Sequence, residues 1–400
     1  MKVRIHNFKI KPERKAVPIF IIIMMATIST DVHLLNKYHE YEKPQEVIEL
    51  TQKTRDTFYP KLYSDKNITS NAIETDERFK DIVVFERRDN MLANVISTVK
   101  NSFWNKDSEK LEYGTWLWTP IINITPEYRD SIISGASQNN INTIYLSIDS
   151  YLDIFVMTDG PEKEKKKKEF DNTILDFIIH AKKYNISVDA EAGWRNWAEA
   201  GHLYKAYAVL NYAIEFNKKY KEKLRGFQFD VEPYLLSSYK IDKEAVLGKF
   251  VDLIDQSVMK LDSSDLKLSV VIPEFYDSSS SETPSFEYRG YTGHTFDHLL
   301  RILDRRQGST ITVMSYRNFA SGDDGSIDVS NQEIESADNH STKIIIAQET
   351  GDVMPPYTTF HNTEKSYYDK QLETLAEEFF SKKSFGGFAA HYVNTFIVLD

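Results

Sequence analysis

The feature that most constrains the fold is a series of eight apolar, strand-like runs within residues 112–400, separated by segments with helical periodicity. Helix-like segments include residues 173–184, 202–223 and 367–382. Strands that alternate with helices pair in parallel, and eight such units predict a closed (β/α)8 barrel of the TIM type, in the α/β class. An open doubly wound sheet is the main alternative, but no Gly-rich phosphate-binding turn follows the first run. The runs span residues 113–118, 141–149, 186–194, 224–233, 266–275, 309–316, 343–350 and 385–392.

Residues 1–30 have the layout of a signal peptide or a membrane anchor. Six Lys and Arg residues among the first 15 precede an apolar run over residues 16–28. A basic head before a short apolar run is typical of a secretory signal, and the run is shorter than the roughly 20 residues of a spanning helix. Cleavage after Ser29, an uncleaved anchor and a buried N-terminal strand are the alternatives. The first two predict a secreted or cell-surface protein, which contacts the membrane only if this segment stays uncleaved.

Residues 31–111 are polar and charged without a sustained period, and they are predicted to form a partly helical arm or linker. Residues 112–400 then make up the barrel domain.

Composition narrows the class of function. The chain of 400 residues has no Cys and a net charge of −11. The lack of Cys excludes disulfides, thiol catalysis and Cys-ligated metals, and the acidic balance argues against nucleic-acid binding. There is no Walker A loop, no G-x-S-x-G elbow and no evident metal-ligand set, so we expect no cofactor and no metal. We expect a monomer.

The fourth run ends in a group of polar residues, Gln228, Asp230 and Glu232. Because side chains alternate along a strand, these three share one face, whereas Phe227 and Phe229 occupy the other. Functional side chains of such a barrel lie at the carboxyl ends of its strands, and polar groups inside it are costly unless they hydrogen-bond or act. Two neighbouring carboxylates push their pKa values apart, so one can keep its proton and act as an acid. The alternative is a polar cluster that only closes the barrel.

This segment resembles the fourth-strand signature of family 18 glycoside hydrolases, the chitinase-type enzymes, which reads Asp-Gly-x-Asp-x-Asp-x-Glu. Residues 225–232 read Arg-Gly-Phe-Gln-Phe-Asp-Val-Glu, so the last Asp-x-Glu is kept and the first two Asp are replaced by Arg225 and Gln228. Residues 192–194, Ala-Gly-Trp, resemble the third-strand Gly-Gly-Trp of that family. Residues 314–316, Met-Ser-Tyr, resemble its sixth-strand Met-x-Tyr.

Two departures from the family pattern lie elsewhere in the chain. Arg317 stands where an Asp often follows the sixth-strand Tyr, and His391 and Tyr392 stand where the last strand usually has a Trp.

The resemblance implies a glycoside hydrolase that cleaves an N-acetylhexosamine-containing polysaccharide or oligosaccharide. In that family the 2-acetamido oxygen of the sugar attacks the anomeric carbon, so no enzyme nucleophile is needed. The resemblance implies that Glu232 is the general acid, that Asp230 orients the acetamido group and stabilises the positive intermediate, and that Tyr316 hydrogen-bonds the attacking carbonyl. Gln228 can donate to Asp230 but cannot share a proton with it as an Asp would.

Two other functions are compatible with the sequence. Glu232 ends the fourth run and Glu349 ends the seventh, and clan A retaining glycosidases place the acid/base and the nucleophile at those two ends. Val231 stands where that clan usually has Asn before the Glu, and Glu349 can equally be a rim carboxylate paired with an Arg. The second alternative is an inactive barrel that binds glycans as a lectin. The replacements at Arg225 and Gln228 favour a lectin, whereas the retained Asp230-x-Glu232 pair argues against one.

The remaining candidates are substrate-binding residues at the barrel mouth. Trp side chains near the ends of the first and third runs can stack on sugar rings, although some of them can be core instead. On the third run, Asp189 and Glu191 can bind sugar hydroxyls or a cation. The predicted substrate-binding residues are Gln228, Trp116, Trp118, Trp194, Glu191, Glu349, His391 and Tyr392.

Overall fold

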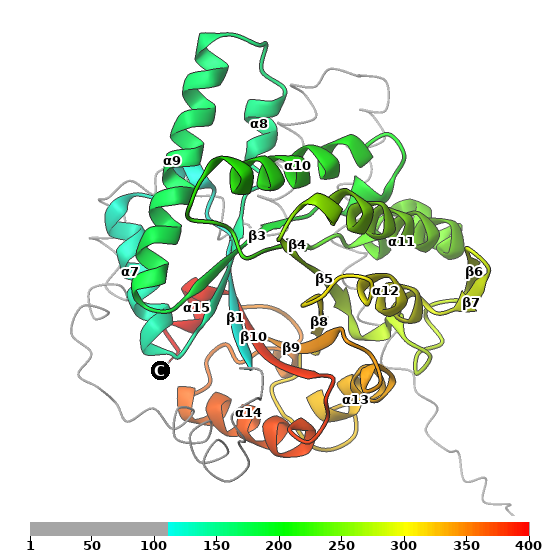
Figure 1. Ribbon diagram of the computed structural model, residues 1–400. Helices are drawn as coiled ribbons and strands as arrows, with labels where there is room; N and C mark the ends of the chain where they lie inside the picture. The colour runs from blue at the N-terminus through cyan, green and yellow to red at the C-terminus, as the bar shows by residue number, and fades with distance from the viewer. Residues whose placement is uncertain (1–110, 400) are drawn as a thin grey trace, which may run out of the picture. The chain divides into compact units, whose positions relative to one another are not determined.

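The computed structural model describes residues 111–399, and its main sheet is a closed barrel of parallel strands (Figure 1). The strands follow the order β1-β10-β9-β8-β5-β4-β3-β2 around the barrel, which confirms the predicted (β/α)8 fold. The predicted signal or anchor and residues 31–110 of the predicted arm lie outside the described residues. The barrel strands are β1 (Glu112–Leu117), β2 (Thr143–Ser147), β3 (Ser187–Ala192), β4 (Gly226–Phe229), β5 (Lys267–Pro273), β8 (Thr310–Met314), β9 (Lys343–Glu349) and β10 (Phe385–His391).

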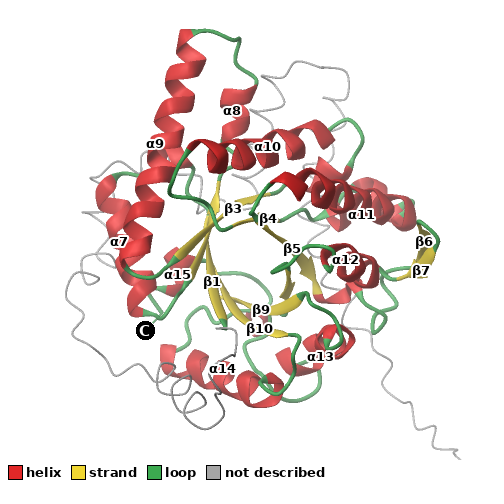
Figure 2. Cartoon of the chain, viewed as in Figure 1, coloured by secondary structure: helices red, strands yellow, loops and turns green. Residues whose placement is uncertain are grey.

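Helices surround the strands on the outside of the barrel (Figure 2). The α-helices are α7 (Pro126–Gln138), α8 (Tyr151–Phe155), α9 (Pro161–Lys183), α10 (Leu203–Lys219), α11 (Lys243–Lys260), α12 (Thr295–Leu303), α13 (Ser326–Ala337), α14 (Lys365–Phe379) and α15 (Val393–Phe396). The 3-10 helices are η3 (Ile121–Asn123), η4 (Arg195–Ala198), η5 (Pro233–Leu235), η6 (Ser237–Lys240), η7 (Leu261–Ser263), η8 (Glu274–Tyr276) and η9 (Pro356–Thr358). Within residues 111–399, no helix is both long enough and apolar enough to cross a bilayer.

Apolar side chains form two separate layers, one on each face of the barrel wall. The outward-facing strand residues, such as Phe227, Phe229 and Ile344, pack with the helices in one large cluster. A smaller cluster fills the interior and contains Trp116, Trp118, Tyr145, Val271, Ile345, Ala347 and Ala389. This division follows from the alternation of side chains along each strand.

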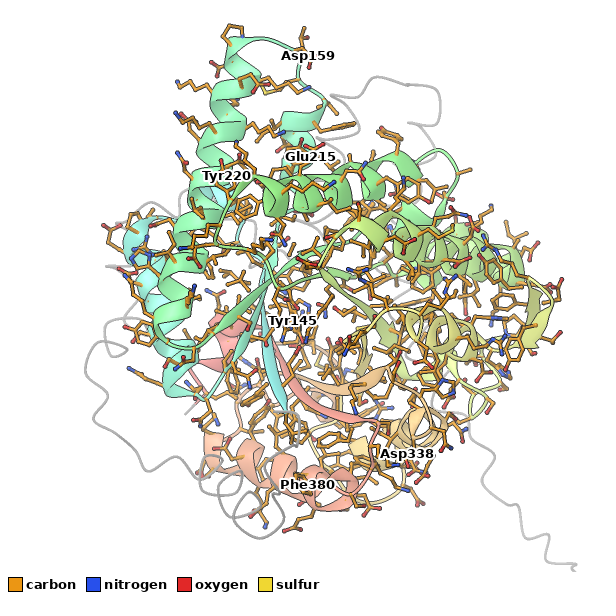
Figure 3. All side chains as sticks on the ribbon, in the orientation of Figure 1. Tyr145, Asp159, Glu215, Tyr220, Asp338 and Phe380 are labelled. Carbon is orange, nitrogen blue, oxygen red and sulfur yellow. The ribbon has the colours of Figure 1, made fainter. Side chains whose placement is uncertain are left out.

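Tyr145 marks the interior in Figure 3, where it lies among the strands at the centre of the barrel. It pairs in register with Trp116 of β1 and Asp189 of β3. Asp159, which lies between α8 and α9, is at the far periphery of the same view. The interior therefore combines large aromatic side chains with polar ones, unlike a barrel filled only by branched aliphatics.

A short hairpin after β5 was not predicted from the sequence. It consists of β6 (Phe286–Tyr288) and β7 (Tyr291–Gly293), which pair antiparallel. The two residues of its turn, Arg289 and Gly290, have φ values of 49° and 78°, as a type I′ hairpin turn requires. Strands of three residues are too short for a periodic pattern to be recognised.

Candidate functional site

A group of aromatic rings surrounds His391 at the carboxyl end of the barrel. Its ring centroid lies 5.6 Å from Trp116 and 5.7 Å from Trp118. It lies 5.9 Å from Tyr316, at an angle of 30°, and 5.3 Å from Tyr392. The ends of β1, β8 and β10 therefore meet around one imidazole, as expected for the mouth of a parallel barrel.

Glu349, the last residue of β9, holds His391 in place. Its Oε2 lies 2.7 Å from His391 Nδ1, and its Oε1 accepts from the backbone N–H groups of Thr350 and Gly351 at 2.8 and 2.6 Å. The carboxylate is 4% exposed. Both carboxylate oxygens are thus engaged inside the protein, which makes Glu349 a support for His391.

The second ring nitrogen of His391 also has a partner. Trp118 Nε1 donates to Nε2 at 3.1 Å, so in the neutral imidazole Nδ1 donates to Glu349. Burial opposes a charge on the ring, but Glu349, and after it Asp230 and Glu232, raise the pKa of His391 above its ordinary value. If the ring takes up a second proton, that proton lies on Nε2, which can then no longer accept the hydrogen bond from Trp118. The charges of the carboxyl groups that follow β4 therefore act on the His391 ring.

The polar residues of the fourth run divide between the strand and the loop that follows it. Strand β4 ends at Phe229, so Gln228 lies inside the barrel wall, whereas Asp230 and Glu232 lie just beyond the strand end. Gln228 is fully buried. Its Oε1 accepts from Trp116 Nε1 at 2.7 Å and its Nε2 donates to Thr312 at 3.4 Å. The expected bond from Gln228 to Asp230 is replaced by this pairing with Trp116 and Thr312.

Asp230 is placed by a close approach of β3 and β4. A Cβ added to Gly193 would lie 1.7 Å from the backbone oxygen of Asp230, so only glycine fits there. The Asp230 N–H donates to the backbone oxygen of Ala192 at 3.2 Å. The Gly of the Ala-Gly-Trp segment thus positions Asp230 through the backbone.

Glu232 is a half-buried acid whose hydrogen-bond donor is an uncharged phenol. Tyr234 OH donates to its Oε1. Burial raises the pKa of Glu232 most, and the opposing influences of Tyr234, His391 and Arg195 do not cancel that rise. A raised pKa lets Glu232 hold its proton to higher pH than an exposed Glu does, which favours a role as general acid.

The remaining predicted substrate-binding residues fall into two groups by burial. Trp116 and Glu191 are each 1% exposed and lie within the barrel, where Glu191 pairs in register with Gln228. Trp194 and Tyr392 are half-buried. The half-buried rings can present a face to a ligand, whereas Trp116 instead supports His391 and Gln228.

Asp189 lies at the opposite end of the barrel from the mouth. Arg225 Nε donates to its Oδ1 at 2.8 Å and Nη2 to its Oδ2 at 2.5 Å. Arg225 also forms an ion pair with Glu112 at 2.7 Å, and Tyr145 OH donates to the same Glu112 carboxylate. The suggestion that Asp189 binds a sugar or a cation is therefore wrong. Arg225, a departure from the family motif, neutralises two carboxylates at the amino end.

Two residues of the site were missed from the sequence. Tyr234 contacts Glu232, and Arg195 lies over the Trp194 ring at 5.4 Å, where the Glu232 charge acts on it. The only local signal was Glu-Pro-Tyr, since a Pro directly after Glu232 starts a turn that returns the next side chain toward the site. Within residues 111–399, no group of three or more His, Asp or Glu is arranged to hold a metal ion.

Several solved structures resemble this barrel. A family GH18 chitinase from Cycas revoluta in complex with allosamidin matches with a TM-score of 0.45 and 12% identity, over 72% of this chain and 96% of that one. An exo-beta-1,4-mannosidase from Opitutaceae bacterium strain TAV5 matches with a TM-score of 0.46 and 8% identity, over 70% and 51%. A beta-mannanase from the blue mussel Mytilus edulis matches with a TM-score of 0.42 and 9% identity, over 71% and 87%.

No family model matches the sequence, and no curated protein matches it. The barrel is established by its strand order, and resemblances with TM-scores below 0.5 do not define a substrate.

Proposed function

We propose that this protein is a glycoside hydrolase that cleaves an N-acetylhexosamine-containing glycan by substrate-assisted acid catalysis. The observation that carries the proposal is Glu232, a half-buried carboxyl group at the barrel mouth that accepts a hydrogen bond from Tyr234 and whose pKa is raised by desolvation. It is two residues from Asp230 in the sequence, and the negative charges of Asp230 and of ionised Glu232 raise the pKa of His391. An acid that keeps its proton beside a carboxylate is the pair that glycoside cleavage needs.

In the first step Glu232 gives its proton to the glycosidic oxygen as the bond to the anomeric carbon breaks. The acetamido oxygen of the same sugar attacks that carbon, so the electron pair of the broken bond leaves with the protonated alcohol. Water then adds to the cyclic intermediate and returns a proton to Glu232. No protein nucleophile takes part.

Asp230 and Tyr316 act on the acetamido group. A carboxylate at Asp230 orients the amide N–H and stabilises the positive charge that develops on the ring. The Tyr316 hydroxyl donates to the attacking carbonyl. The Tyr316 ring stacks on the His391 ring at an interplanar angle of 30°. The charge of Asp230 raises the pKa of that same imidazole.

The clan A alternative requires Glu349 to attack the sugar, and the environment of Glu349 argues against that role. Its Oε1 accepts two backbone N–H groups and its Oε2 is bound by His391. These three hydrogen bonds hold the carboxylate in place and reduce its nucleophilicity, which disfavours attack on an anomeric carbon.

The decisive experiment compares a 2-acetamido glycoside with its 2-hydroxy counterpart, for the wild-type protein and for Glu232→Gln, Asp230→Asn and Glu349→Gln. We expect turnover of the 2-acetamido substrate only, a loss of about 10²- to 10⁴-fold for Glu232→Gln and a strong loss for Asp230→Asn. Turnover of the 2-hydroxy sugar alone would contradict the proposal, because that substrate has no internal nucleophile. Tight glycan binding without turnover would indicate a lectin.

Glu333→Gln is the matched control for the loss of a buried acid. Glu333 lies in α13, is fully buried, and has a pKa raised chiefly by burial. It makes no contact with the residues around His391 that we have described. Activity should be retained in this variant. A loss of activity in Glu232→Gln would then result from the place of Glu232 in the site and not from the removal of an acid inside the protein.

We also propose that the protein acts outside the cell, as expected from the basic and apolar character of residues 1–30. Cell fractionation tests this, and recovery of the full-length chain from the cytoplasm alone would contradict it.

A further inference from the structure

We propose that Tyr234 is the positioning residue of the acid: by donating to Oε1 of Glu232, its hydroxyl directs the transferable proton to Oε2. This inference rests on the proposed function, because it assigns the orientation of the proton that Glu232 delivers. It adds a residue that the resemblance to chitinase-type enzymes does not provide.

The local chain makes this contact possible. Pro233 follows Glu232 directly and opens η5, and the backbone N–H of Leu235 donates to the backbone oxygen of Glu232 at 3.1 Å. The ring of Pro233 favours entry into the 3-10 turn, since a proline at the first helical position loses no intrahelical hydrogen bond. The turn brings the Tyr234 side chain back to the carboxyl group two residues before it.

The Tyr234 ring is fixed by a second element. Phe275 and Tyr276, both in η8 at the end of β5, contact it edge-on, with centroid distances of 5.3 and 6.3 Å and interplanar angles of 83° and 86°. Edge-to-face packing of this kind has a preferred geometry. The position of the hydroxyl is therefore set by the ends of both β4 and β5, and Glu232 is held against a rigid donor.

A phenol suits this task because it keeps its own proton. Burial, and after it the charge of Glu232, raise the pKa of Tyr234 well above its ordinary value. A protonated carboxyl has one oxygen that donates and one that accepts. With Oε1 accepting from Tyr234, the proton is carried by Oε2. After the transfer the same hydrogen bond stabilises the carboxylate, so Tyr234 favours the proton's departure.

The test is Tyr234→Phe, which removes only the hydroxyl and keeps the ring packing. We expect kcat to fall about ten- to a hundredfold, as for a lost hydrogen bond to a charged group, with KM nearly unchanged. The Tyr234 hydrogen bond lowers the pKa of Glu232, so the alkaline limb of the pH–rate profile should move to higher pH. A purely structural role would not move that limb.

Tyr212→Phe is the matched control. Tyr212 is buried, and its hydroxyl, like that of Tyr234, donates to a carboxyl group: it bonds Asp171 at 2.8 Å in the contact between α10 and α9. This variant should lose some stability but keep kcat and the pH profile of the wild-type protein. An unchanged kcat and an unchanged alkaline limb in Tyr234→Phe, with Glu232→Gln inactive, would overturn the inference and leave the proposed function intact.

A second measurement does not depend on turnover. Infrared difference spectra between a protein and its Glu232→Gln derivative isolate the titration of the Glu232 carboxyl, with Tyr234 present and in the Tyr234→Phe background. The inference predicts a higher pKa for Glu232 without the phenol, and equal titrations would overturn it. If the wild-type protein hydrolyses neither sugar, the proposed function fails, and these spectra still decide whether Tyr234 controls the carboxyl.

Discussion

The two ends of the barrel contain similar side chains in opposite electrostatic situations. At the amino end, Asp189 and Glu112 are both paired with Arg225. At the carboxyl end, Glu232 is held by the neutral phenol of Tyr234, and burial raises its pKa. A guanidinium strongly favours the ionised form of a neighbouring carboxylate. The hydrogen bond from the Tyr234 phenol also lowers the pKa of Glu232, but it does not cancel the rise that burial causes.

The carboxylates at the amino end are suited to stabilising the barrel, whereas Glu232 at the carboxyl end is suited to acid catalysis. An ionised carboxylate in an ion pair cannot donate a proton, but it can join neighbouring strands. A carboxyl that keeps its proton costs stability when it ionises, but it can act as an acid. The comparison predicts that substitutions at the mouth change activity more than stability, and that substitutions at the amino end do the reverse.

The largest expected effect is that of Glu232→Gln on catalysis. We expect kcat/KM to fall by about 10²- to 10⁴-fold, with a melting temperature at neutral pH equal to or above that of the wild-type protein, because an isosteric neutral group replaces a buried acid. Steady-state rates and thermal unfolding measure the two quantities. A variant that unfolds readily would contradict the assigned difference between the two ends, since Glu232 would then stabilise the fold.

Arg225→Gln should show the opposite pattern at the amino end. Removing the guanidinium leaves the Asp189 and Glu112 carboxylates without their partner, and such a loss costs about 3–5 kcal/mol in the free energy of unfolding. Activity per folded molecule should persist. Urea unfolding measures the effect, and Lys182→Gln, which breaks an exposed pair with Glu222, should cost less than about 1 kcal/mol.

The stability of the protein should depend on pH through Glu232 at the barrel mouth. The pKa of Glu232 in the folded protein lies above its ordinary value of 4.5, so the folded state holds the proton more tightly than the unfolded state. Its contribution to stability is complete below pH 4.5 and is lost as the pH rises through the raised pKa.

Glu232→Gln has no such titration. The melting temperatures of the variant and the wild-type protein should therefore differ least below pH 4.5, and the difference should grow in favour of the variant as the pH rises. Thermal unfolding between about pH 4 and pH 8 measures this change, which amounts to about 1.4 kcal/mol for each unit of pKa shift. A difference that shrinks with pH would mean that Glu232 is ionised and paired in the folded protein.

Glu349→Gln should have the smallest effect. The amide oxygen can still accept from Thr350 and Gly351, so the strand end should keep its shape. The lost charge should lower the pKa of His391, because Glu349 is the largest influence raising it. We expect less than about a tenfold change in kcat/KM, with the His391 titration followed by NMR. A loss as large as that of Glu232→Gln would favour Glu349 as a nucleophile.

Much of the fold could be predicted because its signals are local. Every barrel strand lies within or overlaps one of the eight apolar runs. The alternation of side chains in β4 also placed Phe227 and Phe229 correctly against the helices, with Gln228 inside the barrel. The β6–β7 hairpin was missed because each of its strands has only three residues.

The sequence by itself determined the barrel and the position of the Asp230-x-Glu232 pair at the end of its fourth strand, since both follow from periodicity and from the order of the elements. The tertiary structure decided which polar groups meet. Arg225 reaches Asp189 from 36 residues away and His391 reaches Glu349 from 42. Such pairs depend on how strands align around the barrel and on which groups lose contact with water, and no local spacing specifies either. The tertiary structure therefore paired Asp189 with a guanidinium and Glu232 with a neutral phenol.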